Sequence, residues 1–216
     1  MSQSKPLWVR ARGPLACFTR PEMKVERVSY EVMTPSAARG LLEAVLWKPA
    51  IRWNIHEIHV LAPIRWQSFR RNEVDQRISE RMAAYAIEDH RTQRNTVALR
   101  DVDYAVRATF SMTAKAGSDD SVKKFEEMFE RRLEKGQHFH QPYLGCREFA
   151  ARVEPLDGTP PPAIDQGVER PLGMMLFDLE YAEEVARPLF FSARLANGVL
   201  HVPTHDQVKS AAGGTP

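Results

Sequence analysis

Hydrophobic and polar residues alternate near the start of the chain and then take up helical spacing. A half-buried strand is predicted where one alternating set faces inward, namely Leu7, Val9 and Ala11. Thr34 suits the N-cap of a helix and Pro35 suits its first position. Apolar residues at helical spacing follow them until Pro49, so we predict a helix over about residues 35–47.

Further strands and a second helix complete a recognisable order. Alternation over residues 51–60 predicts a strand whose phase slips near His56, as a β-bulge requires. Residues 102–110 alternate again, 122–133 have helical spacing, and 147–153 suit a short strand. The resulting order, strand–helix–strand–strand–helix–strand, is the ferredoxin-like pattern that RNA-recognition domains share.

The last third of the chain is predicted to be β-structure. Residues 155–162 carry four prolines and one glycine, which indicates a linker or a sharp crossover. Strands are predicted over residues 174–179, 189–196 and 199–202, and Asn197-Gly198 joins the last two as a hairpin turn.

Together these patterns predict an α+β chain with two parts. The first is a ferredoxin-like (RRM-like) N-terminal domain over residues 1–154, with an inserted basic arm over residues 64–100. The second is a small antiparallel β domain over residues 163–203, rich in hairpins. Residues 204–216 are predicted to be a flexible tail.

Composition narrows the class of protein. The chain has 216 residues, of which 43% are hydrophobic and 27% are charged, which is ordinary for a folded soluble domain. The start of the chain has no apolar signal region and no stretch is long enough to span a membrane, so we expect a cytoplasmic protein. Two cysteines, Cys17 and Cys146, are too few for a disulfide framework.

Arginine outnumbers lysine and is concentrated in one region, although the net charge is only +2. Acidic residues are interleaved there, which indicates either a solvated surface or an arm that follows a phosphate backbone. We expect a long insertion or hairpin, with at most a short helix from about Ile78 to Ile87. The arginines of this region are Arg65, Arg70, Arg71, Arg77, Arg81, Arg91, Arg94, Arg100 and Arg107.

Histidines supply the first candidate chemistry. His56 and His59 are three apart in a predicted strand, which does not match the helical spacing of a zinc motif. His138 and His140 are two apart and suit either general acid–base chemistry on RNA or an ordinary surface loop. The pattern therefore predicts no metal site.

Two adjacent lysines open the second predicted helix. Lys123 and Lys124 each disfavour the charged form of the other, and the positive helix start adds to this effect. They suit either phosphate binding and proton transfer or simple solvation.

Several strings resemble those of one protein family, in the same order along residues 7–203. The strings are Ala16–Tyr30, Thr34–Gly40, Leu46–Trp53, Arg70–Val74 and Tyr143–Phe149. They resemble those of the CRISPR-associated type I-C endoribonuclease, the "d" subtype of the fifth Cas family.

This resemblance implies metal-independent cleavage of precursor CRISPR RNA at the 3′ side of the repeat hairpin. The 5′ handle of the product is then retained in the type I-C surveillance complex, whose backbone and large subunits are the implied protein partners. The neighbouring 2′-hydroxyl attacks the scissile phosphate, which requires a base, a cation and an acid for the leaving oxygen. No cofactor and no membrane are implied.

The resemblance also assigns residues. The family's tyrosine, lysine and histidine align with Leu46, Lys124 and Phe125, so only the lysine is kept. We expect Lys124 to hold the phosphorane charge and His138 or His140 to replace the missing histidine. The expected RNA-binding residues are Arg20, Lys24, Arg27, Arg70, Arg71, Lys123, Arg132 and Arg147.

Two other functions are compatible with these residues. One is a subunit that caps the 5′ handle of CRISPR RNA without cutting it. The other is nonspecific binding of duplex DNA through the arginine-rich arm. Incubating the protein with a repeat hairpin in the presence of a chelator distinguishes cutting, which gives a discrete product, from binding, which leaves the RNA intact.

Overall fold

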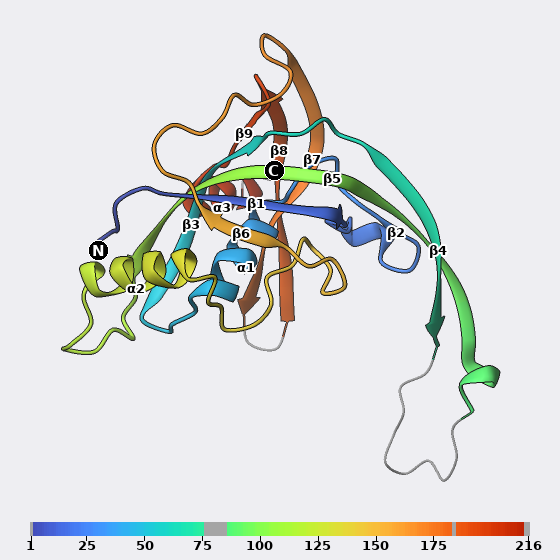
Figure 1. Ribbon diagram of the computed structural model, residues 1–216, viewed down its shortest axis with the longest axis horizontal. Helices are drawn as coiled ribbons and strands as arrows, with labels where there is room; N and C mark the ends of the chain where they lie inside the picture. The colour runs from blue at the N-terminus through green and yellow to red at the C-terminus, as the bar shows by residue number, and fades with distance from the viewer. Residues whose placement is uncertain (1, 76–85, 183–184, 214–216) are drawn as a thin grey trace.

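The computed structural model describes residues 2–75, 86–182 and 185–213. Within them, one long sheet carries three helices, which makes the chain an α+β protein (Figure 1). The strands are β1 (Leu7–Ala16), β2 (Arg27–Val28), β3 (Ile51–Val60), β4 (Trp66–Val74), β5 (Arg91–Met112), β6 (Arg152–Pro155), β7 (Glu169–Ala182), β8 (Val185–Ala196) and β9 (Val199–His201). The helices are α1 (Pro35–Val45), α2 (Val122–Glu134) and α3 (His205–Gly213), with 3₁₀ turns η1 (Pro21–Met23) and η2 (Ile87–His90).

The strand order brings distant segments of the sequence together. The sheet runs β6-β1-β5-β3-β9-β8-β7, and β2 and β4 pair with β5 outside this path. These pairings are antiparallel except for that of β2 with β5. Because β9 pairs with β3, the C-terminal strands continue the sheet of the N-terminal part.

Helix α1 forms where the sequence predicts it. The Thr34 side chain accepts a hydrogen bond from the Ala37 amide at 3.3 Å, and Pro35 takes the first position. The helix ends at Val45 because Leu46 is extended, with φ −142°. Its buried face packs on the sheet through Ala38, Leu41, Leu42 and Val45.

Helix α2 begins at a similar cap. The Ser121 hydroxyl accepts a hydrogen bond from the Lys124 amide at 3.2 Å. The inward residues Phe125, Phe129 and Leu133 are buried, and the ring of Phe129 lies 4.7 Å from that of Trp53. Phe125 is therefore part of the core, as the helical spacing indicates.

The predicted bulge in β3 is confirmed. The pairing of β3 with β5 shifts register between Ile55 and Glu57, so His56 is the extra residue. The His56 ring nitrogen Nε2 lies 2.8 Å from Thr109 Oγ1, and His59 Nε2 lies 2.9 Å from Glu57 Oε2.

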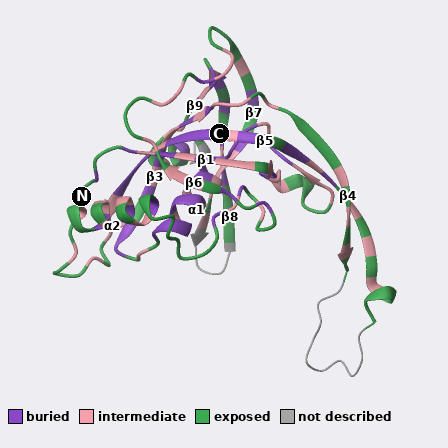
Figure 2. Cartoon of the chain, viewed as in Figure 1, coloured by how far each residue is buried: buried purple, intermediate pink, exposed green. Residues whose placement is uncertain are grey.

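The arginine-rich insertion is a two-stranded arm. Strand β4 pairs with the first part of β5, from Trp66 opposite Leu99 to Val74 opposite Arg91. Figure 1 shows this arm curving away from the body, and Figure 2 shows that its outer part is mainly exposed whereas buried residues gather in the sheet and α1. Most of the short helix expected from Ile78 to Ile87 lies outside the described residues, and η2 begins at its last residue.

Two expectations about the later chain are corrected. The strand expected over residues 147–153 begins at Arg152, because Leu144 and Phe149 close a tight loop first, with the Leu144 amide donating to the Phe149 carbonyl at 2.8 Å. The tail expected from residue 204 is a helix over residues 205–213. Its Val208 side chain is only 2% exposed and is the one buried side chain among residues 205–211, so the sequence carries little apolar signal there.

Candidate functional site

The start of α2 holds Lys124 in a defined position. Its ammonium lies 3.0 Å from Asp120 Oδ1 and donates to the Asp119 carbonyl at 3.3 Å. The side chain is 45% exposed, whereas that of Lys123 is 84% exposed. Because Phe125 fixes the next position in the core, Lys124 stays on the solvent side of the helix.

These contacts change the pKa of the neighbouring Asp120 carboxylate. The pKa of Asp120 is lowered first by the Gly117 amide, which donates to Asp120 Oδ2 at 3.1 Å, and then by the Lys124 ammonium. Lys48 adds a smaller effect in the same direction. At the start of α2, the Asp120 carboxylate is therefore influenced by two ammonium groups, those of Lys124 and Lys48.

His138 and His140 lie in the exposed segment that follows α2. This segment is fixed against the end of α1, because the amides of Phe139 and His140 both donate to the Ala44 carbonyl, at 2.7 and 3.4 Å. The His140 ring stacks on Tyr143, with centroids 6.0 Å apart and planes at 26°.

The three candidate catalytic residues fall at opposite ends of α2. The helix has 13 residues, and at a rise of about 1.5 Å per residue it is roughly 20 Å long. Lys124 belongs to its first turn, whereas His138 and His140 follow its last turn. The described structure thus places the lysine and the histidines in two separate groups.

The residue aligned with the family tyrosine is not available for chemistry. Leu46 is fully buried, and its carbonyl accepts a hydrogen bond from Trp53 Nε1 at 3.1 Å. The residues directly after it, Trp47 and Lys48, are more accessible, and Trp47 is 56% exposed. The sequence analysis used these two only as part of a family string, whereas the structure leaves Trp47 exposed and brings the charge of Lys48 to bear on Asp120.

Arg132 joins the two helices. Its Nη1 donates to the Val45 carbonyl at 2.8 Å, at the end of α1 where unpaired carbonyls carry partial negative charge. The guanidinium therefore caps α1, in addition to the RNA contact that the sequence analysis expects of it.

An ion-pair network holds the base of the arm. Two of the expected RNA-binding arginines belong to this network and are paired with carboxylates. Arg27 Nη1 lies 2.8 Å from Glu148 Oε1, and Arg71 bonds to the same carboxylate. Arg71 Nη2 also lies 2.7 Å from Glu73. Burial alone would raise the pKa of Glu148, but its backbone hydrogen bond and the two arginines lower it overall.

Arg70 differs from its neighbour Arg71. It is exposed, and its Nη1 donates to the neutral Gln93 side chain at 3.2 Å. Four further arginines, Arg65, Arg91, Arg94 and Arg100, lie on or beside the arm, whereas Arg77 and Arg81 lie outside the described residues. Arg70 is therefore better suited than Arg71 to bind a phosphate.

The remaining expected RNA-binding residues lie near the first turn of the chain and in the loop before β6. The Arg20 guanidinium lies 4.6 Å above the ring of Tyr30, and Lys24 is exposed beside η1. Arg147 is exposed next to Glu148. These side chains place positive charge around the base of the arm.

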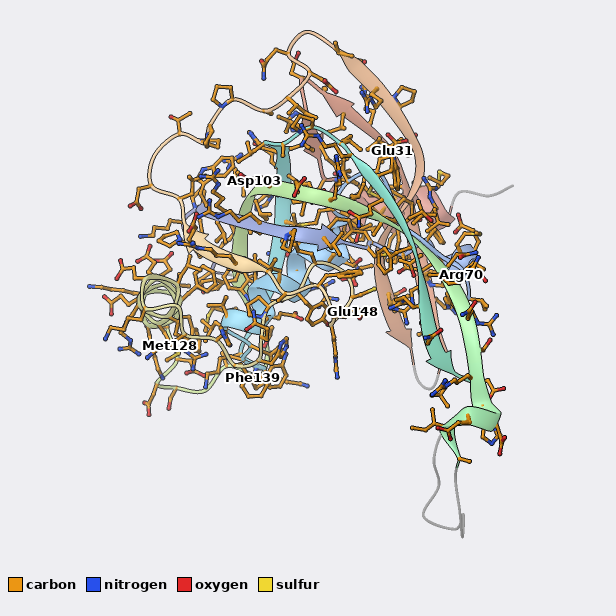
Figure 3. All side chains as sticks on the ribbon, turned by 45° about the vertical axis from the view of Figure 1, so that its right-hand side comes forward. Glu31, Arg70, Asp103, Met128, Phe139 and Glu148 are labelled. Carbon is orange, nitrogen blue, oxygen red and sulfur yellow. The ribbon has the colours of Figure 1, made fainter. Side chains whose placement is uncertain are left out.

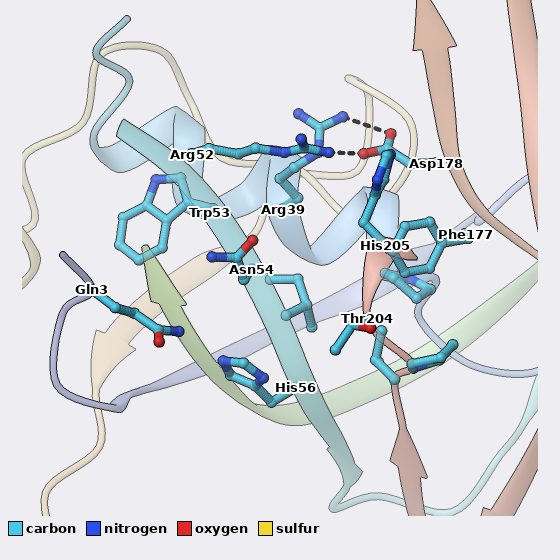
Figure 4. Close-up of a pocket in the computed structure, with 14 residues that line it drawn as sticks. Gln3, Arg39, Arg52, Trp53, Asn54, His56, Phe177, Asp178, Thr204 and His205 are labelled. Carbon is cyan, nitrogen blue, oxygen red and sulfur yellow. Dashed lines mark hydrogen bonds and ion pairs between the residues drawn. The ribbon is translucent and has the colours of Figure 1, made fainter. Parts of the chain in front are cut away.

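A separate cavity of about 170 Å³ lies between β3, the start of α1 and the start of α3 (Figure 4). Arg39 closes one side with two hydrogen bonds of 2.8 Å to Asp178 and further bonds to Glu43. Burial lowers the pKa of His56 and of His205 in its wall. The cavity touches the start of α1, whereas Arg132 and the segment with His138 and His140 lie at its end.

Metal-binding clusters and membrane-spanning helices are both absent from the described part of the chain. Within residues 2–75, 86–182 and 185–213, no group of three or more His, Cys, Asp or Glu side chains is arranged to hold a metal ion. In the same part of the chain, no helix is long and apolar enough to cross a membrane.

Comparison with known proteins identifies the family. The Cas5d model of the CRISPR-associated protein family Cas_Cas5 matches residues 7–203. The chain belongs to the Cas5d family. This confirms the resemblance seen in the strings, with the same bounds along the sequence.

Two curated Cas5d relatives are similar over most of their length. The CRISPR pre-crRNA endoribonuclease Cas5d of Mannheimia succiniciproducens is 50% identical over 207 residues, which cover 88% of this chain and 92% of that protein. The protein of the same description from Thermus thermophilus is 45% identical over 215 residues, with 91% of each chain covered. A solved structure described as a CRISPR-associated protein has a TM-score of 0.74 at 24% identity, covers 96% of each chain and shares the fold.

Proposed function

We propose that the chain is a pre-crRNA endoribonuclease that cuts the CRISPR repeat at the 3′ side of its hairpin and keeps the 5′ handle. The activity named for the two relatives, at 50% and 45% identity over most of the chain, is the observation that carries this proposal. The protein acts in the cytoplasm, and the bound product joins it to the backbone and large subunits of the type I-C surveillance complex.

The proposed chemistry needs no metal ion. The 2′-hydroxyl loses its proton and its oxygen bonds to phosphorus, while the bond from phosphorus to the 5′-oxygen breaks. The products are a 2′,3′-cyclic phosphate and a 5′-hydroxyl, the latter protonated by an acid. The Lys124 ammonium keeps its contacts with Asp119 and Asp120, its third N–H stabilises the charge on the phosphorane, and its 45% exposure supports access by RNA.

The proton-transfer groups are assigned to the histidines that follow α2. His138 and His140 are exposed, and imidazole both gives and takes protons near neutral pH. The length of α2 separates them from Lys124, so joint action requires RNA binding to bring the two groups together. Asp120, beside Lys124, is the alternative base if the histidines only bind RNA.

RNA binding is assigned to the arm and the surfaces beside it. The exposed Arg70, Lys24, Lys123 and Arg147 suit phosphate contacts, together with Arg20. Arg27, Arg71 and Arg132 take part by holding the arm and α1 in place.

We also propose that residues 1–154 form a ferredoxin-like unit. The strand order β6-β1-β5-β3 places the fourth, first, third and second strands of the predicted pattern side by side, with α1 and α2 as its helices. Residues 163–203 then form the β-rich C-terminal unit, joined to the first through β9.

A labelled type I-C repeat hairpin tests the function, with a hairpin of scrambled sequence as the control. A discrete cut in the repeat alone supports the endoribonuclease. An RNA that is bound but intact supports the non-cutting handle-binding subunit. Equal binding of duplex DNA and repeat RNA supports the nonspecific DNA-binding function of the arm, which the exposed Arg70 makes physically reasonable.

A further inference from the structure

Phe139 is the most exposed large apolar side chain among the residues that the structure describes, at 73%. An ordered backbone presents it, because the amides of Phe139 and His140 both donate to the Ala44 carbonyl. Figure 3 shows the residue at the outer edge of the body, well apart from Arg70 on the arm. A single exposed apolar side chain is ordinary on a protein surface, so the case for a ligand here rests on the groups that surround the ring.

The surroundings of Phe139 are aromatic and positively charged. The His140 ring lies 6.0 Å from that of Phe139 and stacks in turn on Tyr143. From residue 131 to residue 147, the only acidic residue is Glu134. The cations of the same segment are Arg131, Arg132, Lys135 and Arg147.

Aromatic rings beside cations help to distinguish a protein partner from a single-stranded nucleic acid. The buried centre of a protein–protein interface is depleted of lysine and of acidic residues, although arginine is enriched there. Sites for single-stranded nucleic acid instead combine a flat aromatic ring with cations that follow the backbone. The segment after α2 has the second character, so its charge is complementary to RNA.

We propose that Phe139 is a stacking platform for an unpaired base of the RNA that flanks the repeat hairpin. This inference rests on the proposed RNA-processing function and adds a recognition site to it. The ring holds the base, while Lys135 and Arg131 lie in the same segment to contact the adjoining phosphates. Phe139 thereby fixes the strand beside His138 and His140.

The test measures equilibrium affinity of the full chain for two RNAs that share one hairpin. The first has normal unpaired flanks, and the second has abasic nucleotides at every flanking position. Phe139→Ala is expected to weaken binding of the first RNA about 5- to 150-fold, the range for loss of one base–aromatic stack, and to leave the second unchanged. Phe139→Trp is expected to restore the affinity, whereas Phe139→Leu is not.

Several outcomes would overturn the stacking site. They are wild-type affinity in Phe139→Ala, equal losses for the two RNAs, and full affinity in Phe139→Leu, which indicates an apolar contact with another protein segment. Met174→Ala, which removes a 60% exposed side chain on β7, is the matched control and should bind as wild type. An RNA that is bound through Phe139 but never cut contradicts the proposed function alone.

Discussion

Lys123 and Lys124 are adjacent in the sequence but differ in their contacts. Lys123 extends into solvent and lies 3.9 Å from Glu127 on the next turn. Lys124 is held by Asp120 and by the Asp119 carbonyl at the start of the helix. A transition-state contact requires such a fixed position, because a mobile ammonium loses entropy when it binds.

Lys124→Ala is therefore expected to reduce the cutting rate by about 10²–10³-fold, the range for losing one donor to a developing oxyanion. RNA affinity should change far less, since one phosphate contact among many is a small part of binding. Single-turnover cleavage of the repeat hairpin measures the rate. Lys123→Ala is the control, and equal rates for the two variants would show that Lys124 has no special role.

Glu148 gives a prediction that depends on pH. Its folded-state pKa lies below the ordinary value of 4.5, so its contribution to stability is present above that value and is lost as the pH falls through the folded pKa. Glu148→Gln should lower the free energy of unfolding by up to about 1 kcal/mol at pH 7, a small value because the side chain is partly exposed. In urea unfolding, the difference between wild type and variant should shrink as the pH falls below 4.5 and disappear once the pH lies below the folded pKa. A difference that persists there would contradict the ion-pair account.

At the scale of elements, the arm combines two roles that the sequence does not separate. Arg70 and Arg71 are neighbours on β4, and alternation in a strand points them to opposite faces. Arg71 turns to Glu148 and Glu73 in the network at the base of the arm, whereas Arg70 faces solvent. The sequence predicts a basic arm. It does not show that Arg71 is paired, because its partner Glu148 lies in a loop 77 residues further along the chain.

The two arginines should accordingly respond differently to alanine. Arg70→Ala should reduce the slope of log affinity against log salt by about 0.7–0.9, because one phosphate contact is lost. Arg71→Ala should leave the slope nearly unchanged and lower the unfolding temperature instead. Filter binding of the repeat RNA at several salt concentrations measures the slope. An unaltered slope in Arg70→Ala would show that Arg70 does not contact the RNA backbone.

Helix α3 illustrates what the local pattern could not show. Its capping residue Thr204 accepts a hydrogen bond from the Gln207 amide at 3.4 Å, and Val208 is buried against the strands. Val208 is the one buried side chain among residues 205–211, which gives no helical period, so docking on the sheet decides the structure. Helices α1 and α2 were predicted correctly, because each has several apolar residues on one face and these show the helical period in the sequence.

Val208→Ala should lower the free energy of unfolding by about 1–2 kcal/mol, the value for two buried methyl groups. Ser210→Ala, at an exposed position of the same helix, should have little effect and serves as the control. Urea denaturation of both variants provides the measurement. Equal stabilities would indicate that α3 does not stabilise the fold.

For the whole molecule, the continuous sheet is the feature that local patterns did not reveal. Individual strands and the bulge near His56 could be predicted from alternation, because each depends on neighbouring residues. The pairing of β9 with β3 joins residues 199–201 to residues 57–59, which no local pattern encodes. Likewise, Lys124 and Phe125 could be placed from helical spacing, whereas the separation of Lys124 from His138 and His140 depends on the length and direction of α2.

If side chains alone cut the repeat RNA, cleavage proceeds in the absence of any metal ion. The purified full chain is incubated with an end-labelled repeat hairpin in excess EDTA, and the ends of the products are analysed. We predict a single cut that leaves a 2′,3′-cyclic phosphate and a 5′-hydroxyl, at the same rate with and without chelator. Loss of cutting in EDTA with recovery on adding magnesium, or a 5′-phosphate on the product, would contradict the account.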